Sequence, residues 1–174
     1  GDTRIELLEH ISTKDTHDLC DATELAIGKD GGFGWVDVPE RDVMERFWQG
    51  VIAAPQRLLF VARLDEVICG TIQLIQPPRN NEAQKHAVHL SSMFLAPWAR
   101  GYGLARRLLN AAERRALQDG YKVANLDVRA TQTGAINLFE TSGYIQCGIH
   151  PYYAEIDQEP VRGYYYYKIL DPKK

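Results

Sequence analysis

One stretch of the chain joins an apolar extended run to a strongly helical run through a loop with two glycines. It covers residues 93–109, MFLAPWARGYGLARRLL, and its glycines are Gly101 and Gly103. Glycines at such a junction let the backbone approach a ligand closely, and the first N–H groups of the following helix have no partner within the helix. Because the helix dipole adds positive potential there, the stretch predicts a strand, a turn and a helix around an anion site, most naturally for phosphate.

The run after these glycines has the periodicity of an amphipathic helix. Polar and charged residues separate its apolar positions, which are Leu104, Leu108, Leu109, Ala112, Ala116 and Leu117. Asp119-Gly120 is typical of a helix end. We therefore expect a helix that buries one face and ends at this pair.

The composition fits one globular domain over residues 1–174, since 45% of the residues are hydrophobic. The net charge is only -3 and no polybasic block occurs, so binding of nucleic acid through charge has little support. Cys20, Cys69 and Cys147 are odd in number and far apart, which argues against a disulfide framework and fits a reducing interior. No apolar run approaches the roughly 18 residues of a membrane span, and no signal-peptide pattern begins the sequence. We expect a cytoplasmic protein without membrane or nucleic-acid partners.

Periodicity and turn residues predict an alternation of strands and helices. In chain order we expect a strand over 4–8, helices over 12–27 and 39–52, a hairpin of strands 58–63 and 67–76, a strand over 87–95, the helix from 104, a strand over 122–128, a helix over 134–142, and closing strands over 145–149 and 164–170. Residues 28–35 hold four glycines and are expected to form a flexible loop, because such a run cannot hold a helix. A second loop is expected around Pro151-Tyr152-Tyr153.

Two segments resemble conserved motifs of the GNAT superfamily of N-acetyltransferases. Residues 100–105, Arg-Gly-Tyr-Gly-Leu-Ala, are similar to its Arg/Gln-x-x-Gly-x-Gly/Ala signature, with Pro97 three residues upstream. Residues 126–130, followed by 135–144, are similar to a second motif of the family. A dinucleotide-binding turn is a rival interpretation, but Arg106 stands where its third glycine would be. A structural glycine turn before a packing helix is the other alternative.

The order of elements is also that of the superfamily, so the resemblance covers nearly the whole chain. It implies an α/β (mixed α+β) fold, with a mixed, mostly antiparallel sheet of about seven strands, splayed in the middle and flanked by about four helices. The length, the loop over 28–35 and the Pro-Tyr-Tyr-Ala run at 151–154 make the chain most similar to the tabtoxin-resistance branch. The substrate of that branch is not carried over.

The resemblance implies acetyl-CoA as acyl donor and no metal. Backbone N–H groups of the glycine loop would hold the pyrophosphate, helped by the charge of two arginines. At the end of the preceding strand, backbone groups would polarise the thioester carbonyl where the strand bulges and the pantetheine arm pairs with it. The residues assigned to the cofactor are Met93, Phe94, Leu95, Arg100, Gly101, Tyr102, Gly103, Leu104, Ala105, Arg106, Gln132 and Phe139.

The reaction implied is direct attack of an amine on the thioester, in which the base matters more than the acid. Deprotonating a primary amine with a pKa near 10.4, about 3.4 units above neutrality, costs roughly 4.6 kcal/mol. Releasing the thiolate without a proton donor costs only roughly 2 kcal/mol. We favour His89 as base, because histidine titrates near neutrality and arylalkylamine acetyltransferases have a catalytic histidine at the equivalent point. Asp127 is the other candidate, either to orient His89 or to meet the substrate ammonium. Ser91 replaces a second histidine of those enzymes and could order a relay water.

The general acid is where the chain departs from the family. Phe139 stands where many members have a tyrosine that protonates the thiolate, and Gln132 replaces the usual asparagine. Tyr144 is the candidate substitute, with Tyr152, Tyr153 or water as alternatives.

We expect the loops over 28–37 and 150–162 to form the wall of the acceptor site. Their acidic residues would suit a cationic amine: Asp30, Asp37, Asp157 and Glu159. Phe33 and Trp35 would either close over a ligand as a lid or pin their loop to the core.

The sequence thus predicts an acetyl-CoA-dependent N-acetyltransferase acting on a small amine or an N-terminus. One alternative is a non-catalytic acyl-CoA-binding module with a degenerate site, motivated by Phe139 and Gln132. Another is an interaction protein without a cofactor. A homodimer is kept as an alternative to the monomer.

Overall fold

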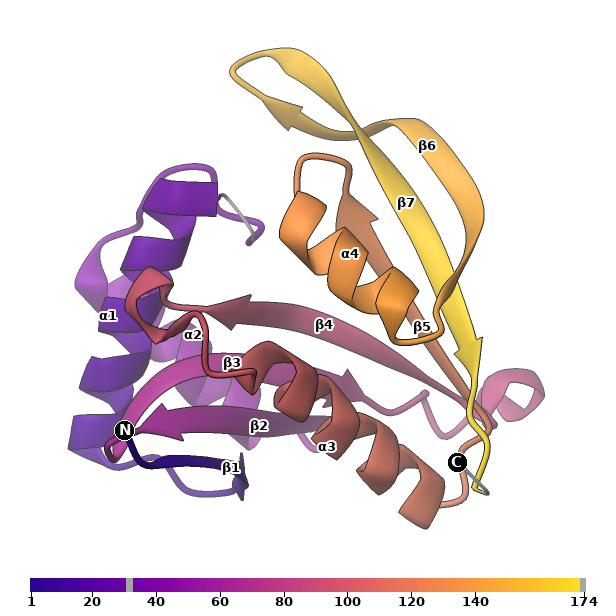
Figure 1. Ribbon diagram of the computed structural model, residues 1–174, viewed down its shortest axis with the longest axis horizontal. Helices are drawn as coiled ribbons and strands as arrows, with labels where there is room; N and C mark the ends of the chain where they lie inside the picture. The colour runs from indigo at the N-terminus through magenta and orange to yellow at the C-terminus, as the bar shows by residue number, and fades with distance from the viewer. Residues whose placement is uncertain (31–32, 173–174) are drawn as a thin grey trace.

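The computed structural model describes residues 1–30 and 33–172, which form one seven-stranded sheet flanked by helices (Figure 1). The elements are β1 (Thr3–Leu8), α1 (Thr13–Asp30), α2 (Arg41–Ala53), β2 (Arg57–Leu64), β3 (Val67–Ile75), β4 (Ala87–Leu95), α3 (Leu104–Gln118), β5 (Val123–Arg129), α4 (Thr133–Thr141), β6 (Ile145–Ile156) and β7 (Glu159–Ile169), with short 3₁₀ helices at Glu82–Gln84 and Pro97–Ala99. The strand order is β1-β2-β3-β4-β5-β7-β6, and only the β4–β5 pair is parallel. The predicted fold class is confirmed.

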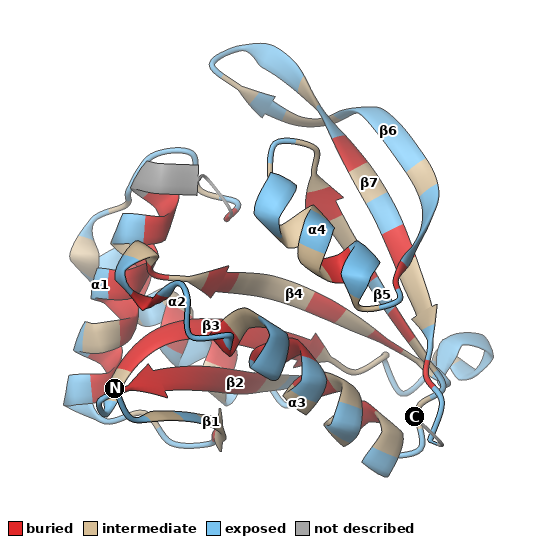
Figure 2. Cartoon of the chain, in the orientation of Figure 1, coloured by how far each residue is buried: buried red, intermediate tan, exposed pale blue. Residues whose placement is uncertain are grey.

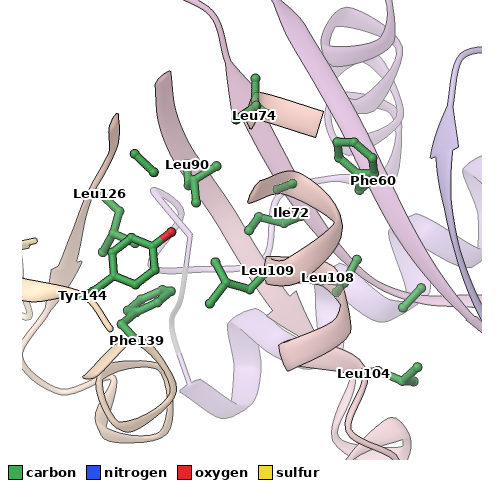
Figure 3. Close-up of a cluster of buried hydrophobic side chains, with 14 of the residues drawn as sticks. Phe60, Ile72, Leu74, Leu90, Leu104, Leu108, Leu109, Leu126, Phe139 and Tyr144 are labelled. Carbon is green, nitrogen blue, oxygen red and sulfur yellow. The ribbon is translucent and has the colours of Figure 1, made fainter. Parts of the chain in front are cut away.

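Each face of the sheet is covered by its own layer of helices. On one face, the leucines of α3 pack with side chains of β2, β3 and β4 and with Phe139 of α4 (Figure 3). On the other face, α1 and α2 bury Leu19, Met44 and Trp48 against the same strands. Burial of each large apolar side chain contributes about 1.5–3 kcal/mol, so β2 and β3, buried along most of their length in Figure 2, anchor both layers. No helix in the described part of the chain is long and apolar enough to cross a membrane.

The sheet divides between β4 and β5. These strands pair for only three residues, from Ala87 with Val123 to His89 with Asn125, and then diverge, as Figure 1 shows. β4 also bulges beyond that point: Thr71 of β3 pairs with Phe94 and Gln73 with Ser91, so Ser92 and Met93 stand opposite one residue of β3. The bulge and the splay that the sequence predicted are both present.

The start of the glycine-rich segment differs from the prediction. α1 continues through Gly28 to Asp30, where the sequence predicted a loop. Its last described turns are held by buried Ala22, Ala26 and Ile27, and such tertiary packing outweighs the low helix propensity of one glycine. Residues 31 and 32 of the predicted loop lie outside the described residues.

The loop predicted over residues 150–162 is wrong, because this segment is part of a long hairpin. β6 and β7 meet at Asp157-Gln158, two residues with positive φ of 52° and 66°. Most of β6 is exposed, so it lacks the alternation of buried and exposed residues from which a strand is predicted. The hairpin extends from the sheet beside α4 (Figure 1).

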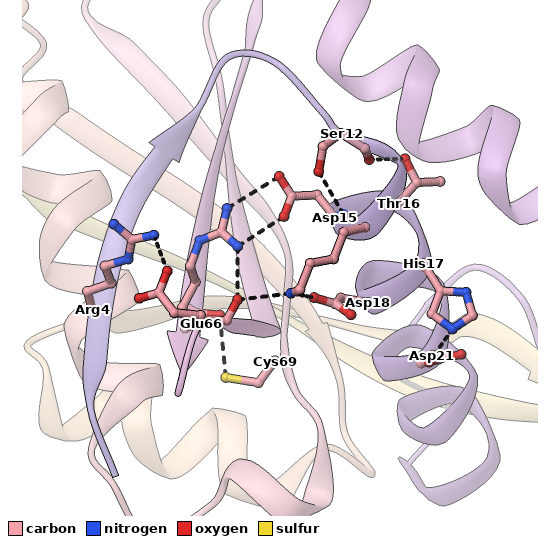
Figure 4. A network of polar contacts seen from close by, with 12 residues as sticks. Arg4, Ser12, Asp15, Thr16, His17, Asp18, Asp21, Glu66 and Cys69 are labelled. Atoms are coloured by element: carbon pink, nitrogen blue, oxygen red, sulfur yellow. Dashed lines mark hydrogen bonds and ion pairs between the residues drawn. The ribbon is translucent and has the colours of Figure 1, made fainter.

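A network of ion pairs joins α1 to the β2–β3 hairpin (Figure 4). Arg63 Nη1 and Nη2 donate to the two oxygens of the Asp15 carboxylate at 3.0 and 3.3 Å, and Nη1 donates to the Glu66 carbonyl at 3.2 Å. Ser12 Oγ caps α1 by accepting from the Asp15 N–H at 3.0 Å. Although burial opposes it, the hydrogen bonds from Arg63 lower the pKa of Asp15.

Candidate active site

The glycine loop between β4 and α3 leaves the N-terminus of a helix open. Gly101 has a φ of 90°, and Gly103, the N-cap of α3, has a φ of 72°. A Cβ at either position would meet nothing within 4 Å, so the backbone conformation, and not crowding, calls for glycine. No side chain caps α3 at Gly103, and its first turn holds Arg106 and Arg107 but no acidic residue. The N–H groups and the helix dipole therefore favour an anion here.

A cavity of about 630 Å³ lies beside this loop, between the end of β4 and the start of α4. It is lined by Met93, Phe94, Leu95, Arg100, Gly101, Gly103, Leu104, Ala105, Arg106 and Gln132 from the expected set. Tyr102 and Phe139 of that set do not line it: Tyr102 is exposed, and Phe139 is buried and lines a second cavity. The cavity thus brings together two strand ends and two helix starts around the loop.

The start of α4 completes this cavity with residues that were not predicted from the sequence. The lining residues it adds are Thr131, Thr133, Gly134, Ala135 and Leu138, with Ala26 of α1. The signal that could have found them is the one that marked the glycine loop, because residues 129–133 again pass from a strand end to a helix start. Here that passage contains Gln132, the N-cap of α4, which was predicted.

The bulged end of β4 presents a free strand edge to the cavity. Thr71 Oγ1 donates to the Ser92 carbonyl at 2.9 Å and fixes the bulge, where Ser92 has a φ of 50°. Gly70 allows β3 to approach closely, because a Cβ there would lie 2.5 Å from the Phe94 carbonyl oxygen. Among the described residues, no strand pairs with the β5-facing edge of β4 beyond His89. An extended ligand can therefore lie along this edge as an added strand.

A second cavity, of about 490 Å³, adjoins the first. Both are lined by Met93, Gln132 and Ala135, so the two cavities share a wall. The second is also lined by residues from the loop after α1, from β6, and from the fork of the sheet, which is the place where β4 and β5 diverge. They include His89, Ser91, Asp127, Phe33 and Tyr153. One cavity therefore faces the glycine loop and the other the polar fork.

Three polar side chains meet in this second cavity. His89 Nε2 lies 3.2 Å from Asp127 Oδ1, and the Tyr153 hydroxyl donates to Asp127 Oδ2. His89 is the last residue of β4 that pairs with β5, and Asp127 lies two residues beyond its partner Asn125. The hydrogen bond with His89, and then that from Tyr153, lower the pKa of Asp127 against the effect of burial. Burial and the bond to Asp127 raise the pKa of Tyr153, so its hydroxyl keeps its proton.

Comparison with known proteins establishes the family. A family model described as "Acetyltransferase (GNAT) family" matches residues 22–144. The chain belongs to the GNAT acetyltransferase family. It is therefore an N-acetyltransferase. This acetyltransferase is also 55% identical over 131 residues to an N-acetyltransferase of the hisH-hisA intergenic region of Azospirillum brasilense, a match that covers 75% of this chain and 78% of that one.

Solved structures share the fold of this acetyltransferase. An N-acetyltransferase from Staphylococcus aureus Mu50 has a TM-score of 0.82 at 16% identity, covering 98% of this chain and 100% of the other. An acetyltransferase from Salmonella typhimurium, solved with acetyl-CoA, has a TM-score of 0.78 at 15% identity, covering 98% and 95%. The spermidine N-acetyltransferase of Vibrio cholerae, solved with CoA and spermine, has a TM-score of 0.78 at 16% identity, covering 97% and 95%. The similarity to the tabtoxin-resistance branch stays a prediction.

Tyr144, the expected general acid, lies away from both cavities of the acetyltransferase. Its side chain is buried, with the ring centroid 5.8 Å from that of Phe139 and the hydroxyl donating to Glu113 Oε2 at 2.9 Å. Burial and the Glu113 charge raise the pKa of Tyr144 far above neutrality. The residue is thus part of the core, and the motif that contains it serves packing at this position. Tyr152 is exposed and donates to Glu155, and it lines neither cavity.

The segment after α1 is pinned to the core of the acetyltransferase. Phe33 is buried, its ring centroid 4.9 Å from that of Phe94, and its carbonyl accepts a hydrogen bond from Arg129. Trp35 packs on Phe47 at 4.9 Å. Of the two roles considered for these rings, lid or attachment to the core, the structure shows attachment to the core.

The acidic lining differs from the prediction. Asp37, Asp157 and Glu159 are exposed and line neither cavity, and the side chain of Asp30 lies outside the described residues. The carboxylates that do line the second cavity are Asp127 and Glu155.

The two arginines predicted to contact the cofactor, Arg100 and Arg106, both line the first cavity. Arg106 also joins α3 to the end of α4, donating to Ser142 Oγ at 3.1 Å and to Thr141 Oγ1 at 3.0 Å. Arg106 thus lies in the first turn of α3 while its guanidinium is held at the far end of α4.

Proposed function

We propose that this acetyltransferase transfers the acetyl group to a primary amine, on a small molecule or a peptide N-terminus, by direct attack. The observation that carries the proposal is the cluster of His89, Asp127 and Tyr153 in the second cavity, which shares the wall of Met93 and Gln132 with the first cavity. We assign the first cavity to the donor, acetyl-CoA, and call it the donor cavity. A thioester reaching that wall would face an amine held beside His89. Reacting atoms held in such proximity account for a large part of enzymatic rate acceleration.

The donor side works mainly through backbone groups. In the proposed complex, N–H groups from Gly101 to Arg106 hold the pyrophosphate, and Arg100 and Arg106 add positive charge. The pantetheine arm lies along the open edge of β4, and backbone donors near the bulge at Ser92 polarise the thioester carbonyl. Residues of β4 thus support both binding and charge stabilisation.

The base in this proposal is His89. With Nε2–H directed at Asp127 Oδ1, Nδ1 keeps a lone pair for a proton of the acceptor ammonium. Asp127 stays ionised, because its pKa is lowered, and it stabilises the imidazolium that forms. The neutral amine attacks the carbonyl and the C–N bond forms; as the tetrahedral adduct collapses, the C–S bond to CoA breaks and the nitrogen loses its second proton to solvent water. The pKa of a primary amine lies about 3.4 units above pH 7, so removing its proton with a base accounts for roughly 4.6 kcal/mol of the barrier.

The leaving thiolate takes its proton from solvent. Phe139 carries no proton, and Tyr144 lies outside the site with its hydroxyl on Glu113. A thiolate near pKa 8.5 is only about 1.5 units above neutrality, so the missing acid costs at most roughly 2 kcal/mol.

The test is acetyl transfer itself. The protein is incubated with acetyl-CoA and a panel of small amines and short peptides with free N-termini, and free thiol is followed together with the mass of the product. We expect thiol release that depends on the amine and matches the acetylated product mole for mole. No turnover above buffer across the whole panel would contradict the proposed acceptor class.

Direct attack has its own measurement. The protein mixed with acetyl-CoA in the absence of amine should keep its unmodified mass, since no acyl-enzyme forms. A +42 Da species that forms rapidly and is discharged by added amine would replace direct attack with a covalent route.

A further inference from the structure

The strand β6 is irregular where it lines the second cavity. His150 pairs with Gly163 and Ala154 with Val161, so residues 151–153 of β6 stand opposite a single residue of β7. The Tyr152 N–H donates to His150 Nδ1 at 2.9 Å, which fixes the irregularity from within. Bulges of this kind redirect side chains, and here the redirected residue is Tyr153.

Tyr153 reaches the cavity by crossing the neighbouring strand. In the sheet, β7 lies between β5 and β6, yet the Tyr153 hydroxyl donates to Asp127 on β5. The ring passes over Gly163, where a Cβ would lie only 2.5 Å from Tyr153 Cδ1. Gly163 has no left-handed φ, so crowding by the ring, and not the backbone conformation, calls for glycine here. Tyr165 packs edge-on against the ring, with centroids 6.0 Å apart.

We propose that Tyr153 and Gly163 form a positioning pair for the acetyl transfer: the hydroxyl of Tyr153, admitted by the bare backbone of Gly163, fixes the carboxylate of Asp127 so that its other oxygen orients His89. The inference rests on the proposed role of His89 as base. With Oδ2 held by Tyr153, rotation of the carboxylate would break a hydrogen bond, and Oδ1 stays directed at His89 Nε2. This selects the Nε2–H tautomer and leaves Nδ1 free to accept a proton.

Tyr153 acts by position and not by giving up its proton. Its hydroxyl proton lies on the hydrogen bond to Asp127, and burial and that carboxylate keep the hydroxyl protonated. Tyr153 does not line the donor cavity, so the donor does not depend on it. The pair therefore differs from a general acid, because it sets the tautomer and orientation of His89 and does not protonate the departing CoA thiolate.

The first test removes only the hydroxyl. Tyr153→Phe keeps the ring over Gly163, so we expect a folded protein with kcat lowered about tenfold and KM for acetyl-CoA within about twofold of wild type. Tyr152→Phe, which loses a similar hydroxyl-to-carboxylate bond one residue away, is the matched control and should keep its kcat. Unchanged kcat in Tyr153→Phe would overturn the proposal.

The second test fills the space under the ring. Gly163→Ala should displace Tyr153 and lower kcat to the level of Tyr153→Phe, and adding Gly163→Ala to Tyr153→Phe should cause little further loss. Gly148→Ala is the control on the same hairpin, because its Cβ would meet Tyr165 at an ordinary 3.7 Å. If the two fold-losses of kcat multiplied in the double variant, Gly163 would act independently of Tyr153, and this would contradict the proposed positioning pair.

A third measurement needs no turnover and separates this inference from the proposed function. Nitrogen-15 NMR of the imidazoles, with the His89 signals assigned by their absence in His89→Gln, reports the tautomer. We expect the Nε2–H form in the wild type and a mixture of tautomers in Tyr153→Phe. If the wild type acetylates no amine, the proposed function fails while these spectra still decide the inference; if the wild type is active and the spectra of the two proteins agree, the inference alone fails.

Discussion

At the scale of single residues, the proposed chemistry depends on how the His89 side chain is held. The His89 side chain is 42% exposed and its Nε2 lies 3.2 Å from Asp127, so the ring is reachable from the cavity yet oriented from behind. An exposed histidine without such a partner would rotate freely and expose either nitrogen. His17 also pairs with a carboxylate, that of Asp21 at 3.3 Å, but this pair lies exposed on α1 and lines neither cavity, whereas the His89–Asp127 pair lines the second cavity.

Replacing this histidine gives a prediction in the pH profile. We expect His89→Gln to lower kcat/KM for the amine about 100-fold at pH 7.5 and less than about fivefold at pH 10, because more than about a quarter of an amine with a pKa near 10.4 is already neutral there and the need for a base is small. The measurement is the initial rate of thiol release across this pH range. His86→Gln, at an exposed position three residues away that lines neither cavity, is the control and should follow the wild type. An equal loss for His89→Gln at both pH values would remove it from the role of base.

Sequence reasoning found His89 and Asp127 but not the residue that joins them. Both candidates lie on strands whose boundaries could be predicted from periodicity, and neighbouring strands bring them together. Tyr153 was only one of several alternative acids, because its position depends on an irregularity of β6 and on crossing β7 at Gly163. Tyr144 was preferred from its motif, and the fold places it in the core against Glu113. Local pattern cannot distinguish these two tyrosines, since burial is decided by strand order.

At the scale of elements, the glycine loop is what would hold the donor in the proposed complex. Gly103→Ala forces a side chain onto a φ of 72°, which costs about 1 kcal/mol and shifts the first N–H groups of α3. We expect KM for acetyl-CoA to rise about fivefold, with kcat at saturation within about twofold of wild type. Steady-state kinetics with varied acetyl-CoA would measure this.

The same helix offers the matched control at its other end. Gly120 has a φ of 88° and, like Gly103, open space where its Cβ would be. Gly120→Ala should therefore lower Tm about as much as Gly103→Ala does, because the backbone strain is similar, while leaving KM for acetyl-CoA unchanged. If both variants changed KM alike, the effect would come from strain in α3 and not from the anion site.

The elements themselves were largely predictable. The loop, α3 and the β2–β3 hairpin follow from glycine positions and from strong periodicity, and each lies within a few residues of its predicted bounds. The outer part of β6 was missed because its residues are mostly exposed and Pro151 interrupts the run. α1 extends past its predicted end because buried Ala26 and Ile27 hold the last turns.

At the scale of the whole molecule, the parallel pair at the fork sets the geometry of the site. β4 carries His89 and the bulge, and β5 carries Asp127, and these strands separate immediately after their three shared pairs. The helices that start from each strand, α3 and α4, then bring two N-termini to one cavity. Both faces of the sheet must stay packed for this fork to stay open, so the stability of the N-terminal half supports the site from a distance.

The Arg63–Asp15 pair is one such support, and its removal predicts a loss of stability. Asp15→Asn removes the charge from one of the two carboxylates paired with the buried Arg63 guanidinium and leaves that of Glu6, so we expect the free energy of unfolding to fall by roughly 2 kcal/mol at pH 7. Urea denaturation would measure it. Asp42→Asn is the control: Asp42 also lies in the first turn of a helix and pairs with an arginine, but that pair is exposed, and we expect a change below about 0.5 kcal/mol.

The pH dependence of this difference tests its electrostatic origin. Because the pKa of Asp15 in the folded protein lies below its ordinary value of 3.8, the unfolded chain takes up the proton first as pH falls. The contribution of Asp15 is therefore complete well above pH 3.8 and is lost as pH falls through the lowered pKa. The unfolding free energies of wild type and Asp15→Asn should converge in acid, below about pH 3.8, and stay apart at a constant distance from pH 5 to 7. A difference that did not change over the whole range would mean that Asp15 acts through packing and its backbone cap, and not through its charge.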